Sequence, residues 1–187
     1  MVIAITGMPG SGKSLLANFF CQQHSLSVIQ GGQLIIDAMV AQGIDITPEN
    51  ERKFREDIRA EKGKAILAEM ALPSINDALL ASKHIVIDSL YSLSEYKTLR
   101  STLGPNLIVI AVVAPKQMRY KRLKTRHERP LTPSEAEDRD FAEVERIEKG
   151  GPIALADYTV VNDGEPSKMF AQATRILDDL NRADAGV

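Results

Sequence analysis

The chain of 187 residues lacks tryptophan, has one cysteine, and carries few aromatic residues and little net charge. Cys21 has no partner for an internal disulfide, and its neighbours Phe19 and Phe20 predict a buried thiol inside a helix. With 5% aromatic residues and a formal net charge of −2, the sequence lacks the basic, base-stacking surface of nucleic-acid-binding proteins. No apolar run approaches the roughly eighteen residues that a membrane span needs. We therefore expect a small-molecule partner, with no nucleic acid and no membrane.

The length and composition also bound the domain organisation. A chain of 187 residues with 44% hydrophobic and 26% charged residues can bury one core but is too short for two ordinary domains. We expect a single domain over residues 1–187, as a monomer or a homodimer. The chain begins directly with an apolar stretch and no basic segment precedes it, so we expect a cytoplasmic protein.

Short apolar runs alternate along the chain with longer segments of helical pattern. This alternation is typical of an α/β fold, in which helices cover both faces of a mostly parallel sheet. The predicted strands are Val2–Thr6, Ser27–Gln30, His84–Asp88, Leu107–Val113 and Tyr158–Val161.

Helices are predicted between these strands. Thr47 can cap a long helix that begins at Pro48 and runs toward Leu72, where Pro73 is predicted to break or kink it. The other predicted helices are Lys13–His24, Gln33–Gln42, a short piece reaching Ala81, one from Ser92 or Ser94 to Leu103, Pro115–Arg126 and Ser167–Leu180.

The most specific motif is the run from Gly7 to Ser14 that directly follows the first predicted strand. It has the spacing of a phosphate-binding loop, or P-loop: glycine, four residues, glycine, lysine, and serine or threonine. Glycines let backbone N–H groups turn toward a polyphosphate, while Lys13 can bridge the β- and γ-phosphates and the Ser14 hydroxyl can ligate Mg²⁺. The dipole of the following helix acts at the same place. The residues predicted to bind a nucleoside triphosphate are Gly7, Pro9, Gly10, Ser11, Gly12, Lys13, Ser14 and Leu15.

The predicted strand His84–Asp88 ends in a carboxylate, as a Walker B strand does. In a parallel sheet Asp88 would lie beside the P-loop and hold Mg²⁺ directly or through water. An aspartate at a strand end can also cap the next helix. The P-loop upstream favours the metal role, and both interpretations stay open.

Arginines recur at helical spacings of three and four at Arg119, Arg122, Arg126 and Arg129. Phosphoryl oxygens in transfer need such positive charge, because little else catalyses the step. A solvated basic face, balanced by the acids after Pro133, is the alternative. Arg122 and Arg126 are the favoured catalytic candidates because they lie toward the end of the predicted helix.

Two insertions stand between predicted strands. The first covers about 31–82 and carries Arg55 and Arg59 on one helical segment, and the second covers about 126–151 and holds Arg126 and Arg139 among many acids. In phosphoryl-transfer enzymes such segments form an acceptor-binding lobe and a lid that closes to exclude water.

Several stretches resemble the adenylate-kinase-related branch of the P-loop kinases, and most closely a largely archaeal group labelled nucleotide-kinase-like or dephospho-coenzyme-A-kinase-like. The resemblance covers most of the chain and implies one P-loop kinase-like domain with five strands in the order 2-3-1-4-5, ATP and Mg²⁺. It further implies that Asn162, Asp163 and Gly164 hold the adenine edge, that Arg126 and Arg139 belong to the lid, and that Arg59 serves the acceptor. The matching stretches are Thr6–Ser14, Thr47–Asn50, Ile85–Asp88, Arg122–Arg126, Arg139–Asp140 and Ile153–Gly164.

The chain also departs from these families on the acceptor side. The two places where adenylate-kinase-like enzymes hold the acceptor phosphate with arginine read Gln33–Ile36 and Ser89–Tyr91, and the aspartate base of dephospho-coenzyme A kinases is missing from Ile29–Gly32. An acceptor hydroxyl would need Asp88 or Asp37, whereas an acceptor phosphate would rely on arginines of the two insertions.

Two functional hypotheses follow. The first is an ATP-dependent small-molecule kinase with a nucleotide or nucleoside-like acceptor. The second is an ATP-binding regulatory or interaction protein that hydrolyses ATP slowly on a kinase scaffold, and the missing arginines favour it.

Overall fold

The computed structural model describes residues 1–24, 26–81, 83–127 and 129–185. Five strands form one sheet in the order β2-β3-β1-β4-β5, and every neighbouring pair is parallel. The predicted α/β class and strand order are therefore confirmed. The strands are β1 (Val2–Thr6), β2 (Ser27–Gln30), β3 (Ile85–Asp88), β4 (Leu107–Val113) and β5 (Tyr158–Val161).

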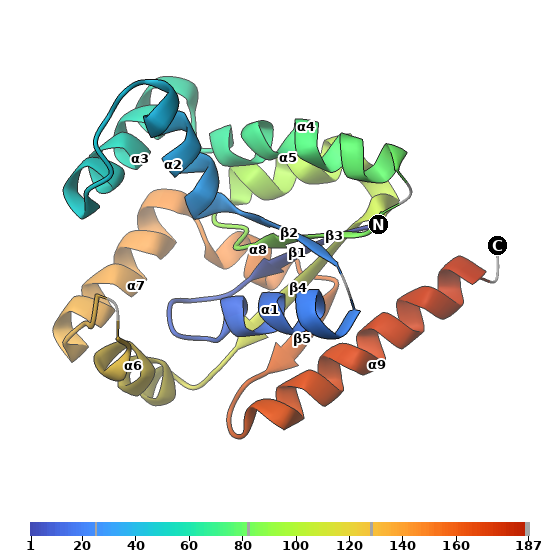
Figure 1. Ribbon diagram of the computed structural model, residues 1–187. Helices are drawn as coiled ribbons and strands as arrows, with labels where there is room; N and C mark the ends of the chain where they lie inside the picture. The colour runs from blue at the N-terminus through green and yellow to red at the C-terminus, as the bar shows by residue number, and fades with distance from the viewer. Residues whose placement is uncertain (25, 82, 128, 186–187) are drawn as a thin grey trace.

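The sheet lies between two helical layers (Figure 1). Helices α4 (Ile66–Leu80) and α5 (Leu93–Leu103) cover one face, and α1 (Lys13–His24) and α9 (Pro166–Ala185) cover the other. Because successive side chains of a strand point to opposite faces, Val2 and Ala4 of β1 join the core under α4 and α5. Ile3 and Ile5 join the core under α1 and α9. Both faces of the central strand are thus buried.

The remaining helices gather around the carboxyl ends of the strands. In Figure 1, α2 (Gly31–Ala41) and α3 (Pro48–Lys62) lie at the upper left, and α6 (Lys116–Thr125) and α7 (Pro133–Ile147) lie at the lower left. A separate apolar cluster joins α2, α3 and α4 through Ile35, Ile58 and Leu67, one residue from each helix. The short α8 (Gly150–Ala154) packs on α5 and β4, and the 3-10 turn η1 (Gly104–Asn106) leads into β4. This edge of a parallel sheet is where ligands bind in open α/β folds.

One predicted helix is wrong. Instead of a continuous helix toward Leu72 that breaks at Pro73, the chain forms α3 and α4 with the break at Gly63. Gly63 has φ 92°, a conformation that glycine adopts readily and that ends a helix. Pro73 lies inside α4, where Ala71 and Ile75 on either side of it are buried in the core. Packing therefore outweighs the proline penalty.

Smaller predictions are settled by the helix ends. The Thr47 hydroxyl accepts from the Asn50 amide at 3.1 Å, so the predicted cap of α3 is confirmed. Ser92, rather than Ser94, caps α5, with its hydroxyl 3.0 Å from the Glu95 amide nitrogen. Cys21 is only half-buried, so the prediction of a fully buried thiol is wrong.

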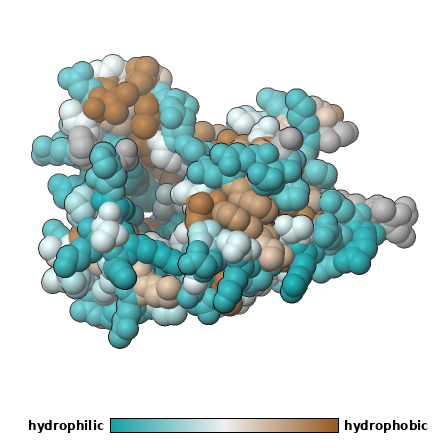
Figure 2. Space-filling model, turned by 60° about the horizontal axis from the view of Figure 1, so that its bottom comes forward, coloured by the Kyte–Doolittle hydropathy of each residue, from teal (hydrophilic) through white to brown (hydrophobic). Residues whose placement is uncertain are grey.

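The surface is mainly polar. Figure 2 shows hydrophilic residues over most of one face, with apolar residues gathered in two separate groups. Among the helices of the described residues, none has both the length and the apolar character to cross a membrane.

Candidate functional site

The P-loop joins β1 to α1 and depends on glycines in conformations that other residues rarely adopt. Gly7 has φ 145° and Gly12 has φ 103°. A Cβ at Gly7 would stand 2.3 Å from the carbonyl oxygen of Val112, and one at Gly12 would stand 2.3 Å from Nδ2 of Asn162. Only glycine fits either position, so the motif spacing produces a tight loop pressed against β4 and the loop after β5.

Two polar side chains occupy the interior of this loop. The Lys13 ammonium donates to the Met8 carbonyl at 3.2 Å, and the Ser11 amide donates to the same oxygen at 3.1 Å. The hydroxyl of Ser11 is buried and has no hydrogen-bond partner within the described part of the chain. A buried hydroxyl of this kind can still bind an incoming polar group.

The loop opens onto a cleft of ≈ 480 Å³, a volume typical of small-molecule sites. Pro9, Gly10, Gly12, Lys13, Ser14 and Leu15 line it, as predicted for nucleotide-binding residues, whereas Gly7 and Ser11 are not among its lining residues. The basic side chains in its walls are Lys13, Arg122, Arg126, Arg139 and Lys149. The cleft therefore gathers all four predicted catalytic cations, Lys13, Arg122, Arg126 and Arg139, in one place.

The electrostatics of the cleft reflect this excess of positive charge. Burial, together with repulsion from Lys149 and Arg139, lowers the pKa of Lys13 to about 7, although the carboxylates of Glu143 and Asp88 oppose the shift. The Lys13 ammonium therefore lies in the field of two further cations and two carboxylates.

Arg119, the first arginine of the predicted stripe, braces the loop. It is 7% exposed, donates to the Pro9 carbonyl at 3.0 Å, and makes a two-pronged ion pair with Asp140 of α7 at 2.9 and 2.6 Å. Planar guanidinium–carboxylate pairing of this kind fixes orientation as well as distance. Arg119 therefore ties the P-loop to α7 and does not belong to a solvated face.

Arg122 and Asn162 hold the P-loop by hydrogen bonds to its backbone carbonyls. Arg122 donates to the Gly10 carbonyl at 3.4 Å and to the backbone and side-chain oxygens of Asn162, each at 3.2 Å. Asn162 is buried, and its amide nitrogen donates to the Ser11 carbonyl at 2.7 Å. Its amide group is thus engaged with the loop, while Asp163 and Gly164 beside it are exposed. The adenine contact of this stretch stays a prediction.

Further lining residues of the cleft come from the predicted lid segment, about residues 126–151. Arg126 donates to the Arg129 carbonyl at 2.5 Å, and burial together with the charge of Arg139 lowers its pKa. Arg139 donates to Glu143 at 3.1 Å, and the ammonium of Lys149 lies 2.5 Å from the second oxygen of Glu143. The sequence analysis missed both Lys149 and Glu143, because an isolated lysine and a glutamate in a charged segment match no motif.

The predicted acceptor-side arginines lie elsewhere. Arg55 pairs with Glu51, which also accepts from Arg129 at 3.0 Å. Arg59 lies 5.8 Å from the ring centre of Tyr91. Neither arginine lines the cleft, although Tyr91 does. A role for these two side chains in binding an acceptor stays a prediction. The structure does not place either of them in the lining of the cleft.

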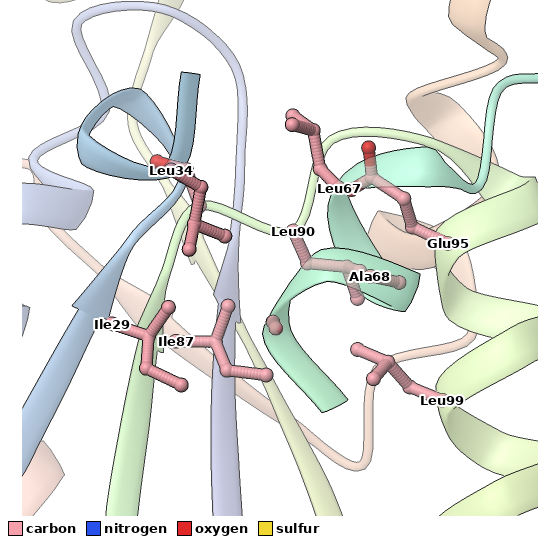
Figure 3. A pocket seen from close by; sticks show the side chains of 11 residues that line it. Ile29, Leu34, Leu67, Ala68, Ile87, Leu90, Glu95 and Leu99 are labelled. Carbon is pink, nitrogen blue, oxygen red and sulfur yellow. The ribbon is translucent and has the colours of Figure 1, made fainter. Parts of the chain in front are cut away.

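A small cavity of ≈ 20 Å³ lies among residues of β2, β3, α4 and α5 (Figure 3). In this view Glu95 stands at its rim, and apolar side chains including Ile87 and Leu99 surround the rest. The Glu95 carboxylate accepts from the Tyr91 amide at 2.7 Å, and its other oxygen lies 3.9 Å from Arg59. Burial raises the pKa of Glu95 to about 7. Glu95 therefore fixes the backbone that carries Tyr91.

Ser14 and Asp88 are the predicted magnesium ligands. Ser14 lines the cleft, and Asp88 is half-buried at the end of β3, where it accepts from the Ser89 hydroxyl at 3.2 Å. Ser89 lines the cleft and has φ 82°, a strained conformation of the kind found at functional sites. Because Ser92 caps α5, the capping alternative for Asp88 is wrong.

Comparisons with known proteins agree with this architecture. A family model described as an AAA domain matches residues 6–138. The UPF0200 protein TK1334 of Thermococcus kodakarensis is 34% identical over 183 residues, which span 96% of this chain and 98% of that protein. A UPF0200 protein of Aeropyrum pernix is 32% identical over 176 residues, which span 94% of this chain and 91% of that protein.

Solved structures show the same fold at low identity. A shikimate kinase from Bacteroides thetaiotaomicron has a TM-score of 0.60 and 13% identity, covering 97% of this chain and 98% of its own. A gluconokinase from Sinorhizobium meliloti has a TM-score of 0.56 and 16% identity, covering 97% of this chain and 96% of its own. The fold is thus that of P-loop kinases, while the finer resemblance to adenylate and dephospho-coenzyme A kinases stays a prediction. The chain belongs to the AAA-domain family of the matching model and, with these archaeal relatives, to the UPF0200 proteins.

Proposed function

We propose that the chain is an ATP-dependent phosphotransferase of the nucleoside-monophosphate-kinase-like class, acting on a small nucleotide or nucleoside-like acceptor. The observation that carries this proposal is a P-loop whose Lys13 lines the same cleft as Arg126 and Arg139 of the predicted lid segment. The gluconokinase and the shikimate kinase of similar fold support the proposal by analogy.

The phosphates of ATP fit the loop for three reasons. Gly7, Gly10 and Gly12 have positive φ, which lets the backbone form a tight loop, the buried Ser11 hydroxyl has hydrogen-bonding capacity to spare, and the loop leads directly into α1. The first backbone N–H groups of a helix and its dipole attract anions. Lys13 would exchange its contact with the Met8 carbonyl for the phosphate oxygens.

Mg²⁺ suits two oxygen donors of the chain, Ser14, which lines the cleft, and Asp88, which ends β3. The hydroxyl of Ser14 and the carboxylate of Asp88 are the hard ligands that this ion prefers, and Asp88 has no arginine or lysine partner among the described ion pairs. When bound, Mg²⁺ would neutralise charge on the phosphates.

The chain's own cations would then stabilise the phosphoryl group in transit. Lys13, Arg122, Arg126 and Arg139 all line the cleft that would hold this group. Fixed positive charge that faces the developing charge is the main source of catalysis in phosphoryl transfer. The ion pair between Arg119 and Asp140 couples the position of α7 to the loop, so the lid arginines are held in register with Lys13.

A regulatory ATP-binding protein is the second candidate. Arginine is absent at the two family positions of the acceptor site, and Arg55 and Arg59 do not line the cleft. Such a protein would bind ATP and hydrolyse it slowly without an acceptor.

A coupled assay of ADP release separates the two functions. Wild-type protein with ATP and Mg²⁺ is assayed across nucleoside monophosphates, nucleosides and dephospho-coenzyme A, with Lys13→Ala as the blank. Lys116→Ala is the matched control, because Lys116 is exposed and pairs with Glu137. A kinase gives acceptor-stimulated release that Lys13→Ala abolishes and Lys116→Ala retains. Slow release that no acceptor stimulates contradicts the kinase proposal and supports the regulatory one.

A further inference from the structure

The lid side of the cleft holds two basic side chains that share one carboxylate. Lys149 is 1% exposed, and its ammonium contacts Glu143 at 2.5 Å. The other oxygen of Glu143 accepts from Arg139 at 3.1 Å. All three residues line the cleft. Two cations share one carboxylate there, so this part of the lining carries excess positive charge.

Burying Lys149 as an ammonium costs free energy that Glu143 only partly offsets. Burial lowers the pKa of Lys149, the charge of Arg139 lowers it further, and the Glu143 and Glu95 carboxylates oppose the shift. A buried charge is stable only when it is paired and hydrogen-bonded. Among the described residues, Glu143 is the one carboxylate that Lys149 and Arg139 share. A second anion in the cleft would give each of the two cations an anionic partner of its own.

Lys149 also contacts the segment that follows β3. Its ammonium lies 4.7 Å from the ring centre of Tyr91, and Arg59 of the acceptor lobe lies over the same ring at 5.8 Å. Tyr91 follows the end of β3, within the segment where family kinases carry an acceptor arginine. Lys149 therefore reaches by tertiary contact a place that the local sequence leaves without a cation.

We propose that Lys149 and Arg139 form a subsite for the phosphate monoester of an anionic acceptor, next to the position of the γ-phosphate. Glu143 holds the two cations in the ligand-free cleft and yields them to the acceptor phosphate. This inference rests on the proposed function and narrows its substrate class, since a neutral alcohol would leave the two cations with Glu143 alone.

The test measures inorganic phosphate binding by calorimetry to protein already saturated with Mg²⁺ and the non-hydrolysable ATP analogue AMPPNP. The analogue fills the γ-position, so added phosphate reports the acceptor side. Loss of one charge-assisted hydrogen bond predicts that Lys149→Met weakens phosphate binding about tenfold or more. Lys149→Arg keeps most of the affinity, and Glu143→Gln strengthens binding because it removes the competing carboxylate.

Lys64→Met is the matched control, because Lys64 pairs with the neighbouring Glu148 and lies outside the cleft lining. It is expected to bind phosphate as wild type does. Acetate in place of phosphate is expected to bind more weakly, and equal binding would overturn the choice of a phosphate group. AMPPNP binding by every variant verifies the fold.

Three results overturn the subsite: no phosphate binding to the wild-type AMPPNP complex, equal phosphate affinity in wild type and Lys149→Met, or weaker binding in Glu143→Gln. The Glu143→Gln result decides the matter even if Lys149→Met fails to fold. Failure of the wild-type protein to bind AMPPNP contradicts the proposed function instead, and this subsite falls with it.

Discussion

The two walls of the cleft are built in different ways. The P-loop wall comes from one short run of the chain, residues 7–14, which bends at glycines of positive φ. Its lining residues are Pro9, Gly10, Gly12, Lys13 and Ser14. The α7 wall, formed by Arg139, Glu143 and Lys149, consists of side-chain charges on a helix and on the turn after it. That turn depends on Glu148, whose left-handed conformation lets the Lys149 amide donate to the Glu143 carbonyl at 3.1 Å. One wall is encoded by spacing and the other by tertiary contact.

The largest expected effect comes from separating the two walls. Arg119→Met removes the ion pair with Asp140 and the bond to the Pro9 carbonyl, and leaves the Asp140 carboxylate without its guanidinium. Breaking a largely buried pair in this way is expected to lower the free energy of unfolding by about 3 kcal/mol. Urea denaturation measures it, with Lys116→Met as control for an exposed pair on the same helix. Equal effects of the two substitutions would mean that Arg119 does not join the walls.

A smaller effect is expected from a change confined to the P-loop wall. Gly12→Ala places a Cβ against Asn162 at a φ that alanine rarely adopts. We expect the loop to shift in response and to lose about 2 kcal/mol of nucleotide binding free energy, or roughly thirtyfold in affinity. Calorimetric titration with Mg²⁺ and AMPPNP measures it. Gly32→Ala in α2 is the matched control, because nothing lies within 4 Å of its Cβ position. Unchanged affinity in Gly12→Ala would remove the argument that the loop requires glycine there.

The smallest effect concerns Glu95. Its carboxylate holds the backbone of Tyr91, and the ring of Tyr91 contacts Lys149 of the α7 wall. Burial raises the pKa of Glu95 from 4.5 to about 7, despite the opposing charges of Arg59 and Lys149. The folded protein therefore binds more protons than the unfolded chain between these pH values, and the contribution of Glu95 to stability is lost as pH rises through the window.

Glu95→Gln removes this dependence. Between about pH 5.5 and about pH 6.5, wild type is expected to lose about 1 kcal/mol of unfolding free energy relative to Glu95→Gln. Urea denaturation of both proteins at several pH values measures the difference. Parallel pH profiles would show that Glu95 is ionised throughout and pairs fully with Arg59.

The sequence predicted the sheet and the P-loop wall because both depend on local patterns. Apolar runs gave all five strands, with only the start of β3 differing by one residue, and motif spacing identified the residues around Lys13. The break at Gly63 instead of Pro73 was missed, because core packing on both sides of the proline is not visible locally.

The α7 wall could not be predicted for a related reason. Arg119 and Asp140 are far apart along the chain, and their pairing depends on how α6 and α7 meet. Lys149 acquires its place only when the turn at Glu148 folds it back onto Glu143. Charge patterns identify candidates such as Arg139, but not which cations share a carboxylate.

The most direct test of the account is calorimetric titration of wild-type protein and Lys13→Ala with AMPPNP in the presence of Mg²⁺. The account predicts saturable binding of one AMPPNP per chain by the wild type, and loss of that binding in a folded Lys13→Ala protein. Binding of equal strength in both proteins, or no binding by the wild type, would contradict the assignment of the cleft as a nucleotide site.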